Sequence, residues 1–498
     1  MTGPREFLKG EDPEAMQETE LKLELSQAAA AALLKKHPFE SAPTVLLQKS
    51  IYFDTAGWEL SRRGLSLRIR QSGNERIQTI KAGDGVAAGS FTREEWERPV
   101  ADDTPVLDEP QIRDLLGVSD RRLASVFEIH VKRHRWNVTE GESTIEVAVD
   151  VGKVVAADRE APLCEIELER KAGPPAALFA LARKVDVITA AHLGVLSKAE
   201  RGYRLLGAVP GGVKASPVPL TPDMNAATVF AQIAAACLRQ FRLNEIALSW
   251  SRNADALHQA RVSLRRVRSL FSICRSLFAD SRFDHLRGEL RWLASDLGNA
   301  RNIDVMIDRA SNDELSSRLQ QARDEAYGAV EASLSSVRAR SLMIDLAEWI
   351  SIRDWRSDQK GEALRLRPAK DFAAGVLDKL WKKVAKGGRN LIDLDDEARH
   401  ELRIVAKKLR YAAEFFGPLY NSKKETKRSK RFLVALEDLQ DHLGSLNDLA
   451  TAPAMLSQLD LSQVAGADDL FSAADKEKLL REAGQAHASF VDSRRFWR

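Results

Sequence analysis

The sequence predicts an α+β protein of two domains, an antiparallel β domain followed by an all-α domain. The chain has 498 residues, which is too long for one typical hydrophobic core. Up to residue 206, short segments alternate charged and apolar residues with a period of two, the period of a β-strand. From residue 223 on, Ala, Leu, Arg and Glu recur with a helical period. We therefore place a β domain at residues 16–206 and a helical-bundle domain at residues 223–498.

The segment between them, residues 207–222, is rich in glycine and proline. Such a segment sustains neither a helix nor a central strand. We interpret it as a linker.

Composition narrows the class of protein. The net charge is only +3, so any anion-binding site must come from local clustering of cations. The three cysteines are widely spaced and form no CxxC pair, which argues against a disulfide framework or a zinc site and fits a reducing cytoplasm. The first twenty residues are polar and acidic, and no apolar run approaches the roughly 20 residues of a membrane span. We expect a cytoplasmic protein that does not use a membrane.

The first strand is the most informative. From Glu18 to Leu25, acids and one lysine alternate with leucines, so that one face of a strand carries Glu18, Glu20, Lys22 and Glu24 and the other face carries the leucines. Unpaired charges are unfavourable in a dry interior. Such a face is useful if it holds a divalent cation on the carboxylates and an anion on the lysine. The alternative is an ordinary solvated strand face.

The same alternation recurs in later strands, which favours the first interpretation. The charged positions of these strands are Arg68, Arg70, Lys81, Arg93, Glu95, Glu97, Glu146, Asp150, Glu165, Glu167 and Glu169. A sheet with one solvated face usually shows mixed polar residues there, not repeated charges. Strands of this kind closed into a barrel enclose a charged lumen of both signs. Such a lumen suits a metal-bound polyanion.

The helical half contains an internal repeat. The segment from His258 to Arg268 is echoed by the segment from His400 to Arg410, and in each, cations follow the histidine after three, seven, eight and ten residues. Each segment is an amphipathic helix with a basic front. A second echo follows each of them, where Gly298 and Gly444 are expected to be helix C-caps.

Two such helices related by pseudo-symmetry would form one shared basic surface that attracts a linear polyanion. For a single basic helix, a solvated surface is the ordinary explanation. The residues predicted for this surface are His258, Arg261, Arg265, Arg266, Arg268, His400, Arg403, Lys407, Lys408 and Arg410.

The first half also resembles a known family. The motif Glu18-x-Glu20-x-Lys22 is followed in order by Tyr52–Thr55, Leu65–Arg70, Thr79–Lys81, Arg93-x-Glu95, Lys132–Trp136, Asp150-x-Gly152, Glu165–Glu169 and Lys198–Tyr203. Over residues 16–206 this set resembles the CYTH superfamily, the triphosphate tunnel metalloenzymes. The resemblance implies an eight-stranded antiparallel β tunnel, or barrel, that binds triphosphate with Mg²⁺ or Mn²⁺. Members include inorganic triphosphatases, thiamine triphosphatases and class IV adenylate cyclases.

The resemblance also implies roles for individual residues. The metal ligands would be Glu18, Glu20, Asp150, Glu165, Glu167 and Glu169. The substrate-binding residues would be Lys22, Arg68, Arg70, Lys81, Arg93, Arg133, Arg135, Lys198 and Arg201. The catalytic residues would be Glu18, Glu20, Lys22 and Lys81. Whether a carboxylate or a metal positions the attacking water stays open.

The second half, residues 223–498, resembles the CHAD domain, a helical module with conserved histidines. The resemblance implies binding of inorganic polyphosphate and, with it, association with polyphosphate granules. The chain departs from the family at Asn302 and at Asn447-Asp448, which puts an acid-dependent role of those turns in doubt. Nucleic acid is less favoured as a partner, because aromatics are only 6% of the chain and none interleaves with the basic positions.

The function predicted from sequence is a metal-dependent inorganic triphosphatase that releases pyrophosphate and phosphate and carries a polyphosphate-binding domain. One alternative is another triphosphate chemistry on the same tunnel, thiamine triphosphatase or adenylate cyclase. Another is a non-catalytic protein that docks on polyphosphate or nucleic acid. No GxxxxGK(S/T) loop is present, which argues against a P-loop nucleotide hydrolase. The preferred metal and the oligomeric state stay open.

Overall fold

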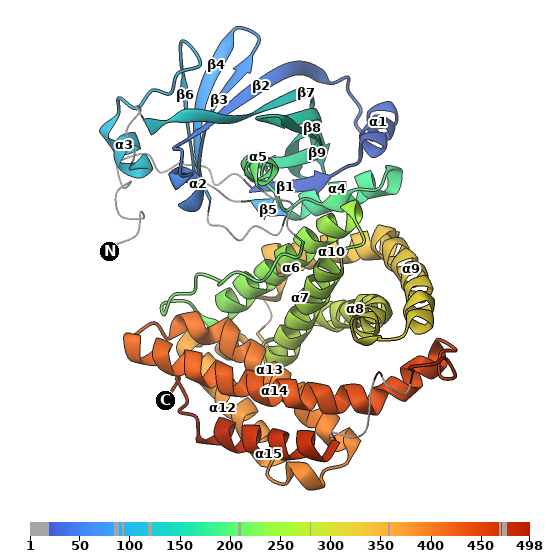
Figure 1. Cartoon of the computed structure of the whole chain (residues 1–498). Helices are drawn as coiled ribbons and strands as arrows, with labels where there is room; N and C mark the ends of the chain where they lie inside the picture. The colour runs from blue at the N-terminus through green and yellow to red at the C-terminus, as the bar shows by residue number, and fades with distance from the viewer. Residues whose placement is uncertain are drawn as a thin grey trace. The chain divides into compact units, whose positions relative to one another are not determined.

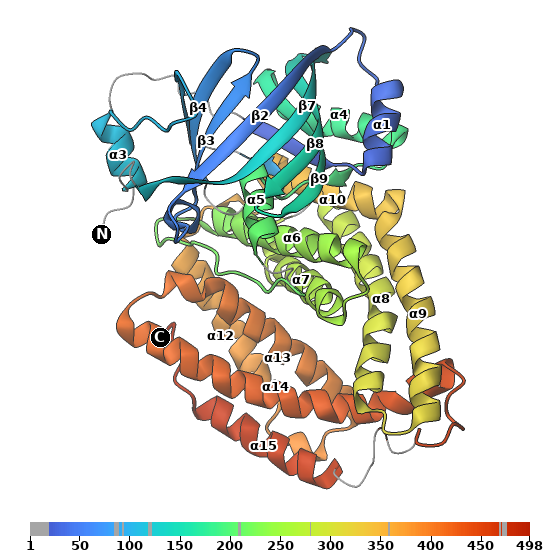
Figure 2. The same ribbon diagram turned by 45° about the horizontal axis from the view of Figure 1, so that its top comes forward.

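A computed structural model describes residues 19–83, 89–91, 94–117, 122–207, 211–278, 280–356, 359–467, 470 and 476–498 (Figures 1 and 2). The described chain forms two compact units. The first unit consists of residues up to Gly211 together with Ser335–Ile352. The second consists of Gly212–Leu334 and Arg353–Arg498. The first unit is therefore discontinuous in sequence.

The first unit is built on one antiparallel sheet, as the alternation predicts. All its strand pairs are antiparallel, and the strand order is β10-β1-β9-β8-β7-β2-β3-β4-β6, with β5 paired to β1. The strands are β1 (Thr19–Glu24), β2 (Thr44–Asp54), β3 (Leu65–Ser72), β4 (Glu75–Ala82), β5 (Ser90–Phe91), β6 (Glu94–Pro99), β7 (Ala124–Glu140), β8 (Ser143–Ala156), β9 (Arg159–Ala172) and β10 (His192–Leu193).

The expected closed eight-stranded barrel is only partly observed. Eight strands are at least six residues long, and β5 and β10 have two residues each. Within the described part of the chain the ladder is not closed, because β6 pairs with β4 and has no register with β1. The physical reason is that two consecutive strands, β5 and β6, pair with different edges of the sheet. Strand β5 pairs with β1 and β6 pairs with β4, so both sheet edges receive a partner without a continuous ladder.

Helices cover the outer face of the sheet. Leu21 and Leu23 of β1 are completely buried on that face, as the alternation predicts. Here α1 (Gln27–Lys35) and α4 (Ala176–Ile188) pack against β9. At the other end of the sheet, α2 (Glu59–Arg62) and α3 (Pro110–Leu116) cover a core of leucines and isoleucines from β2, β3 and β4.

The short helix α5 (Lys198–Leu206) lies against β7, β8 and β9 (Figure 1). A capping box fixes where it begins, because the Ser197 side chain accepts from the Glu200 backbone N–H at 3.2 Å while the Glu200 carboxylate accepts from the Ser197 N–H at 2.8 Å. Gly202 brings α5 close to the sheet, since a Cβ there would lie 2.1 Å from the Phe127 ring. The capping box places Lys198 at the first helical position.

One helix of the first unit comes from the C-terminal half of the sequence. This is α10 (Val337–Ile352), which packs against α4 and β10. The sequence pattern did not predict this placement.

The second unit is helical, as predicted. Its helices are α6 (Ala226–Trp250), α7 (Ala254–Ile273), α8 (Ser281–Arg309), α9 (Asp313–Ser335), α11 (Glu362–Arg365), α12 (Ala369–Gly387), α13 (Asp396–Phe416), α14 (Lys423–Gln458) and α15 (Lys476–Asp492). Single 3₁₀ turns lie at Arg275–Leu277, Asp354–Arg356, Leu391–Asp393 and Gly417–Leu419. In the described part of the chain, no helix combines the length and apolarity that crossing a bilayer requires.

The two repeated motifs lie in α7 and α13, which pack side by side (Figures 1 and 2). The second echoes lie inside α8 and α14, so the expectation that Gly298 and Gly444 are C-caps is wrong. Both helices continue past these glycines, because burial of their apolar stripes outweighs the roughly 1 kcal/mol helix penalty of glycine. A two-fold relation between the copies stays a prediction.

Candidate functional site

The charged face of the sheet encloses a cavity of about 380 Å³. Its walls carry both signs of charge. The cations are Lys22, Arg68, Arg70, Lys81, Arg133, Arg135, Lys171 and Lys198, and the carboxylates are Glu20, Glu95, Glu97, Glu146, Glu167 and Glu169. Strand register produces this arrangement, because Lys22 lies opposite Glu167 across β1 and β9 while Lys81 lies opposite Glu95 across β4 and β6.

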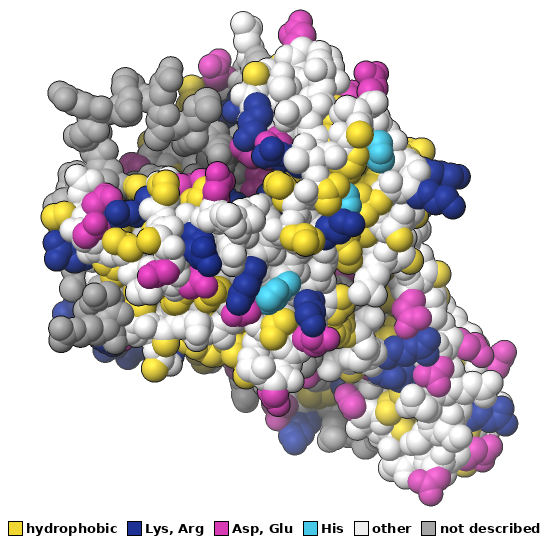
Figure 3. Space-filling view, turned by 90° about the horizontal axis from the view of Figure 1, so that it is seen from above, with side chains coloured by type: hydrophobic (Ala, Val, Ile, Leu, Met, Phe, Trp, Pro, Cys, Tyr) yellow, Lys and Arg dark blue, Asp and Glu magenta, His cyan; other side chains and the backbone are white. Residues whose placement is uncertain are grey.

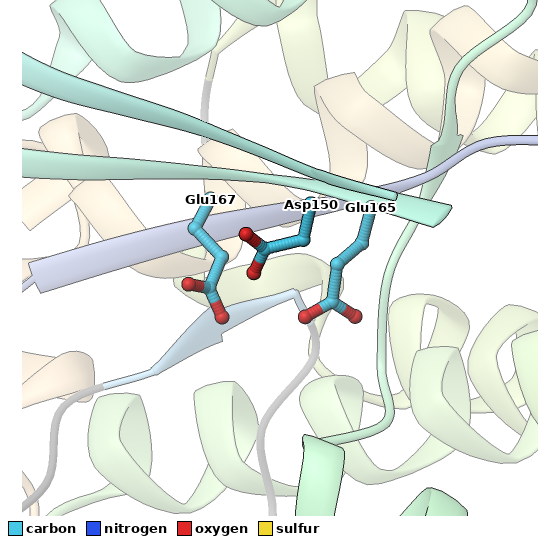
Figure 4. A group of neighbouring side chains, drawn as sticks. All are labelled: Asp150, Glu165 and Glu167. Carbon is cyan, nitrogen blue, oxygen red and sulfur yellow. The ribbon is translucent and has the colours of Figure 1, made fainter. Parts of the chain in front are cut away.

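Three carboxylates converge beside the cavity. Asp150 on β8 and Glu165 and Glu167 on β9 each offer an oxygen within 4.8 Å of the others, and Figure 4 shows their side chains leaving adjacent strands toward the same side. Glu167 lines the cavity, whereas Asp150 and Glu165 are buried behind it. We call these three residues the acidic trio.

Lys198 lies at the centre of the acidic trio. Its Nζ is 2.8 Å from Asp150, 2.5 Å from Glu165 and 2.7 Å from Glu167. Arg133 adds contacts of 2.7 Å to Asp150 and 2.6 Å to Glu167. The trio is therefore held by fixed cations of the protein.

These cations lower the pKa values of two members of the trio, Glu167 and Asp150. Burial opposes the charged form of Glu167, but Lys198, Lys22 and Arg133 outweigh it and hold the pKa of that carboxyl well below its usual range. Burial likewise opposes ionisation of Asp150, and Lys198 and Arg133 lower its pKa. The pKa of Lys198 is raised in turn, because the attraction of the three carboxylates exceeds the effect of burial. Asp150, Glu167 and Lys198 are therefore ionised at neutral pH.

Glu20 is in a different electrostatic state. Burial is the largest influence and raises its pKa, although Lys22 lies 2.9 Å away, and the nearby charge of Glu167 raises it further. The negative charge at Glu20 is thus incompletely compensated by the protein. An additional cation in the cavity would stabilise it.

The remaining walls carry looser ion pairs. Lys81 lies 2.7 Å from Glu95, and Arg70 lies 3.4 Å from Glu97. These groups are more exposed than the acidic trio. A bound anion can therefore replace the carboxylate partners of Lys81 and Arg70 at a lower desolvation cost than in the trio. Arg201 does not line the cavity, but it pairs with Glu24 at 3.0 Å and with Glu165 of the acidic trio at 3.4 Å. Glu169 pairs with Lys171.

In the second unit, α7 and α13 bring cations together. Arg265 interacts electrostatically with Arg403 and Lys407 across the two helices, and His258 and Arg261 lie beside Arg301 of α8. Among the described residues, the buried Nε atoms of Arg265 and Arg403 have no hydrogen-bond partner. We call this group the basic surface.

In the basic surface, burial and neighbouring cations outweigh the effect of nearby carboxylates on the pKa values. Burial, then Arg403, Arg265 and Arg410, lower the pKa of Lys407 to about 7, against a smaller opposing effect of Asp448. Burial and neighbouring arginines lower the pKa of Arg261 to about 10 and that of His258 to about 4. Cations held at such proximity favour a bound polyanion.

The basic surface extends beyond the repeated motifs. Arg268 lies near Arg287 and Arg291 of α8, and Lys408 lies near Lys383 of α12 and Arg287. The sequence pattern did not single out these three neighbours, because they lie outside the repeated segments.

One predicted member does not join the surface. Arg266 is buried between α7 and α13, where it pairs with Glu414 and lies 4.8 Å from the Phe415 ring centroid. His400 contacts Asn447 at 2.6 Å, and Arg410 pairs with Glu437 at 3.4 Å.

Comparison with known proteins agrees with both halves of this geometry. Residues 16–203 match the CYTH domain family, and residues 232–457 match the CHAD domain family.

The chain has a CYTH domain in its N-terminal half and a CHAD domain in its C-terminal half.

The CYTH part is similar to an inorganic triphosphatase of Haemophilus influenzae, with 32% identity over 197 residues. That match covers 38% of this chain and 55% of the relative, so the chain spans about half of that protein. An uncharacterised protein of Mycobacterium tuberculosis is 25% identical over 448 residues, 82% of this chain and 83% of that one. Among solved structures, the CHAD domain of the plant Ricinus communis is 27% identical and covers 57% of this chain and 97% of that one, with a TM-score of 0.47.

The CYTH cavity has the donor chemistry of a divalent-cation site. Mg²⁺ and Mn²⁺ prefer hard oxygen ligands, and carboxylates supply them here. Glu20 and Glu167 face the cavity, and the incompletely compensated charge of Glu20 is where a cation would be stabilised. The residues present therefore fit such an ion.

Two predicted site residues, Glu18 and Arg93, lie outside the described residues. Conversely, Gln48, Tyr52, Ser66, Lys171 and Ser197 line the cavity and were not selected from the sequence. The selection favoured strong charges, so the four neutral residues passed unnoticed. Lys171 is charged and continues the period-two face of Glu167 and Glu169, so the same rule could have found it. The period-two rule does place Gln48 and Tyr52 on the same face of β2 and could have found them.

Proposed function

We propose that the CYTH domain is a metal-dependent inorganic triphosphatase that hydrolyses triphosphate to pyrophosphate and phosphate. The observation that carries this proposal is the cavity of about 380 Å³ whose walls carry both cations and carboxylates. Similarity of the same region to an inorganic triphosphatase supports it.

The cations on the cavity walls would bind the substrate. Arg68 and Arg70 on β3 and Lys81 on β4 would donate to phosphate oxygens, Arg through two parallel N–H groups and Lys as a point charge. Phosphoryl transfer needs mainly positioning and charge neutralisation, which a partly enclosed site supplies more strongly than water.

The carboxylates would hold the divalent cation. Glu20 and Glu167 are the described residues best placed to do so, and Glu169 lies on the same wall. When bound, Mg²⁺ or Mn²⁺ withdraws charge from phosphoryl oxygens. Lys198 and Arg133 would keep Asp150 and Glu167 ionised and fixed while substrate binds.

A phosphate-release panel tests this proposal. Purified protein is given triphosphate, pyrophosphate, ATP, thiamine triphosphate or long polyphosphate, each with Mg²⁺, Mn²⁺ or excess EDTA. We expect triphosphate to be the preferred substrate and EDTA to abolish turnover. Full activity in EDTA would contradict the metal requirement, and preference for thiamine triphosphate would favour that alternative.

A matched pair of variants locates the activity. Glu20→Gln removes a charge from the cavity and should lower kcat/KM roughly 10²-fold or more. Glu128→Gln removes a charge near Lys49 and His130 of β2 and β7, away from the cavity walls, and should leave turnover unchanged.

We propose further that the CHAD domain binds inorganic polyphosphate on the basic surface. The supporting observation is the set of cations from α7 and α13 whose pKa values are lowered by burial and by neighbouring cations, against a smaller effect of nearby carboxylates. Arginine forks and lysine point charges both suit a linear phosphate chain.

Binding of long polyphosphate to the full chain, measured as a function of salt, tests this second proposal. The combined variant Arg265→Ala and Lys407→Ala should weaken binding and reduce its salt dependence. The combined variant Lys478→Ala and Arg481→Ala removes two exposed cations of α15 and serves as the charge-matched control. Tighter binding of single-stranded DNA at equal charge and salt would favour a nucleic-acid function instead.

A further inference from the structure

Helix α10 lies within the segment that matches the CHAD family, yet it belongs to the first compact unit. It is largely apolar, and Leu342, Ile344, Leu346 and Trp349 are almost completely buried. Its neighbours in the first unit are α4 and β10. The triphosphatase-type unit is thus completed by a helix that follows the sheet by more than a hundred residues.

Two sets of ion pairs join α10 to α4. Arg183 on α4 contacts Asp345 at 2.5 Å and Glu348 at 2.6 Å, and its side chain is 38% exposed. Arg340 on α10 contacts Asp186 on α4 at 2.5 Å, with both side chains at most 7% exposed. The first set is partly solvated, whereas the second is buried.

The buried pair continues toward the cavity. The Asp186 carboxylate also accepts from the Ala191 backbone N–H at 3.0 Å. Directly after Ala191 comes β10, which pairs with β1, and the Gly194 N–H donates to the Lys22 carbonyl at 2.8 Å. The backbone approach is so close that a Cβ at Gly194 would lie 3.1 Å from the Lys22 Cβ.

The same stretch of chain leads into α5. Val195 and Leu196 are buried, Ser197 caps the helix, and Lys198 reaches the acidic trio. Residues 191–198 therefore hold two of the cavity's cations, Lys22 through the β10–β1 ladder and Lys198 through the start of α5.

We propose that Arg340 is a positioning residue for the cavity of the CYTH domain. Its guanidinium fixes the Asp186 carboxylate, which holds the Ala191 N–H and thereby sets the path of residues 191–198. Without Arg340, Asp186 is a buried carboxylate without its cation, and it must recruit water or move, which releases Ala191. The catalytic consequence rests on the proposed triphosphatase function.

Variants of the full chain separate this link from general docking of α10. Arg340→Met breaks the pair that leads to Ala191. Arg183→Met breaks the other set of ion pairs between α4 and α10 and serves as the matched control. In the described part of the chain, the ion-pair partners of Arg183 are Asp345 and Glu348, whereas the carboxylate that accepts from the Ala191 N–H is that of Asp186. Arg340→Lys keeps a cation beside Asp186, so its defect should be smaller than that of Arg340→Met.

The first readout is hydrogen exchange and needs no enzymatic activity. Arg340→Met should speed exchange of the Ala191 and Gly194 amides at least about tenfold, and Arg183→Met should not. The second readout is triphosphate hydrolysis, where Arg340→Met should lower kcat about tenfold and Arg340→Lys less. Equal exchange in wild type and Arg340→Met, or equal changes in both Met variants, would overturn the proposal.

A double variant covers the case in which Arg340→Met does not fold. Asp186→Asn combined with Arg340→Met leaves no uncompensated charge but keeps an oxygen that accepts from Ala191. We expect it to fold and to restore slow exchange of Ala191. Rapid exchange in this folded double variant would also overturn the proposal. If the wild type lacks triphosphatase activity, the proposed function is wrong. The exchange results still test whether Arg340 positions residues 191–198 through Asp186.

Discussion

Lys198 shows how one side chain organises the charges of its surroundings. Its ammonium contacts all three members of the acidic trio, which would otherwise repel one another in a buried position. Removing one partner of such a buried group is strongly destabilising, because the remaining charges lose their compensation.

Lys198→Met should therefore lower the free energy of unfolding at pH 7 by about 3–5 kcal/mol. In the wild type, the pKa values of Asp150 and Glu167 lie below their unfolded values of about 3.9 and 4.3. Their contribution is present above those values and is lost as pH falls through the folded pKa. In the variant these pKa values should rise relative to the wild type, while Arg133 and Lys22 still oppose burial, so less stability should be lost on acidification.

Urea unfolding of both proteins between about pH 4 and pH 7 measures this difference. The CHAD unit is the same in both, so its contribution cancels. Parallel pH profiles would contradict the assignment of Lys198 as the main counter-charge.

Lys407 gives a second prediction, for binding. Its pKa of about 7 means that a large fraction of this lysine is neutral at physiological pH. A bound polyanion favours the charged form, so binding takes up a proton and affinity for polyphosphate should fall as pH rises from about 6 to about 8.5. His258, with a pKa of about 4, stays neutral over this range, and Arg261, at about 10, stays charged.

The check is the dissociation constant of long polyphosphate at constant ionic strength for the wild type and Lys407→Arg. The arginine stays protonated, so the variant should bind with little pH dependence. The same pH slope in both proteins would assign the titration to another group.

Alternation along β1 predicted which residues point outward and which inward, and Leu21 and Leu23 are buried accordingly. It did not predict that Lys22 is 6% exposed and enclosed by carboxylates. That environment depends on β9 partners far along the chain, which a local pattern cannot identify. A Lys22 variant therefore perturbs stability as well as binding, and Arg70 is the better probe of substrate contact.

At the scale of elements, α5 is positioned by a glycine. The helix approaches β7 so closely that a Cβ at Gly202 would overlap the Phe127 ring. In an isolated helix, alanine would be more favourable than glycine by about 1 kcal/mol. Any loss of stability in Gly202→Ala therefore reports the clash.

Gly202→Ala should reduce stability by about 1–3 kcal/mol and, by moving Lys198, should reduce triphosphate hydrolysis. Gly57→Ala, at a glycine with no neighbouring atom within 4 Å of the new Cβ, is the control and should be neutral. Thermal melting and phosphate release measure the two effects. A stable, fully active Gly202→Ala variant would show that α5 can shift without consequence.

The elements themselves were largely predictable, and their relations were less so. Period-two segments became strands, and the repeated basic segments became α7 and α13. Closure of the sheet was not predictable, because it depends on how residues 90–99 divide between two edges. The placement of α10 was not predictable either, since Arg340 meets a partner 154 residues away.

At the scale of the molecule, charge is distributed locally. The net charge is only +3, and the face seen in Figure 3 shows cationic and anionic side chains interspersed. The cavity and the basic surface belong to different units, each with its own charge balance.

The two proposed activities should therefore respond to different substitutions. Glu20→Gln should lower hydrolysis and leave the dissociation constant of polyphosphate unchanged. Combined Arg265→Ala and Lys407→Ala should do the opposite. Measuring both activities in both variants checks this, and reciprocal changes would instead indicate a coupling free energy between the sites.

Two domains were predictable from length, from the change of period and from the Gly/Pro-rich segment. Their interleaving was not, because the apolar face of α10 looks like that of any buried helix. Which surface such a helix covers is decided by tertiary packing.

The discontinuity of the first unit has a consequence for its biosynthesis. Ribosomes add about 5–20 residues per second, so α10 emerges on the order of ten seconds after the sheet is complete. During that interval the nascent sheet domain lacks the helix that covers α4 and supplies the counter-ion of Asp186. A fragment that ends at the Gly/Pro-rich segment would lack α10 permanently. Such a fragment would become whole only when the other half is supplied as a separate polypeptide.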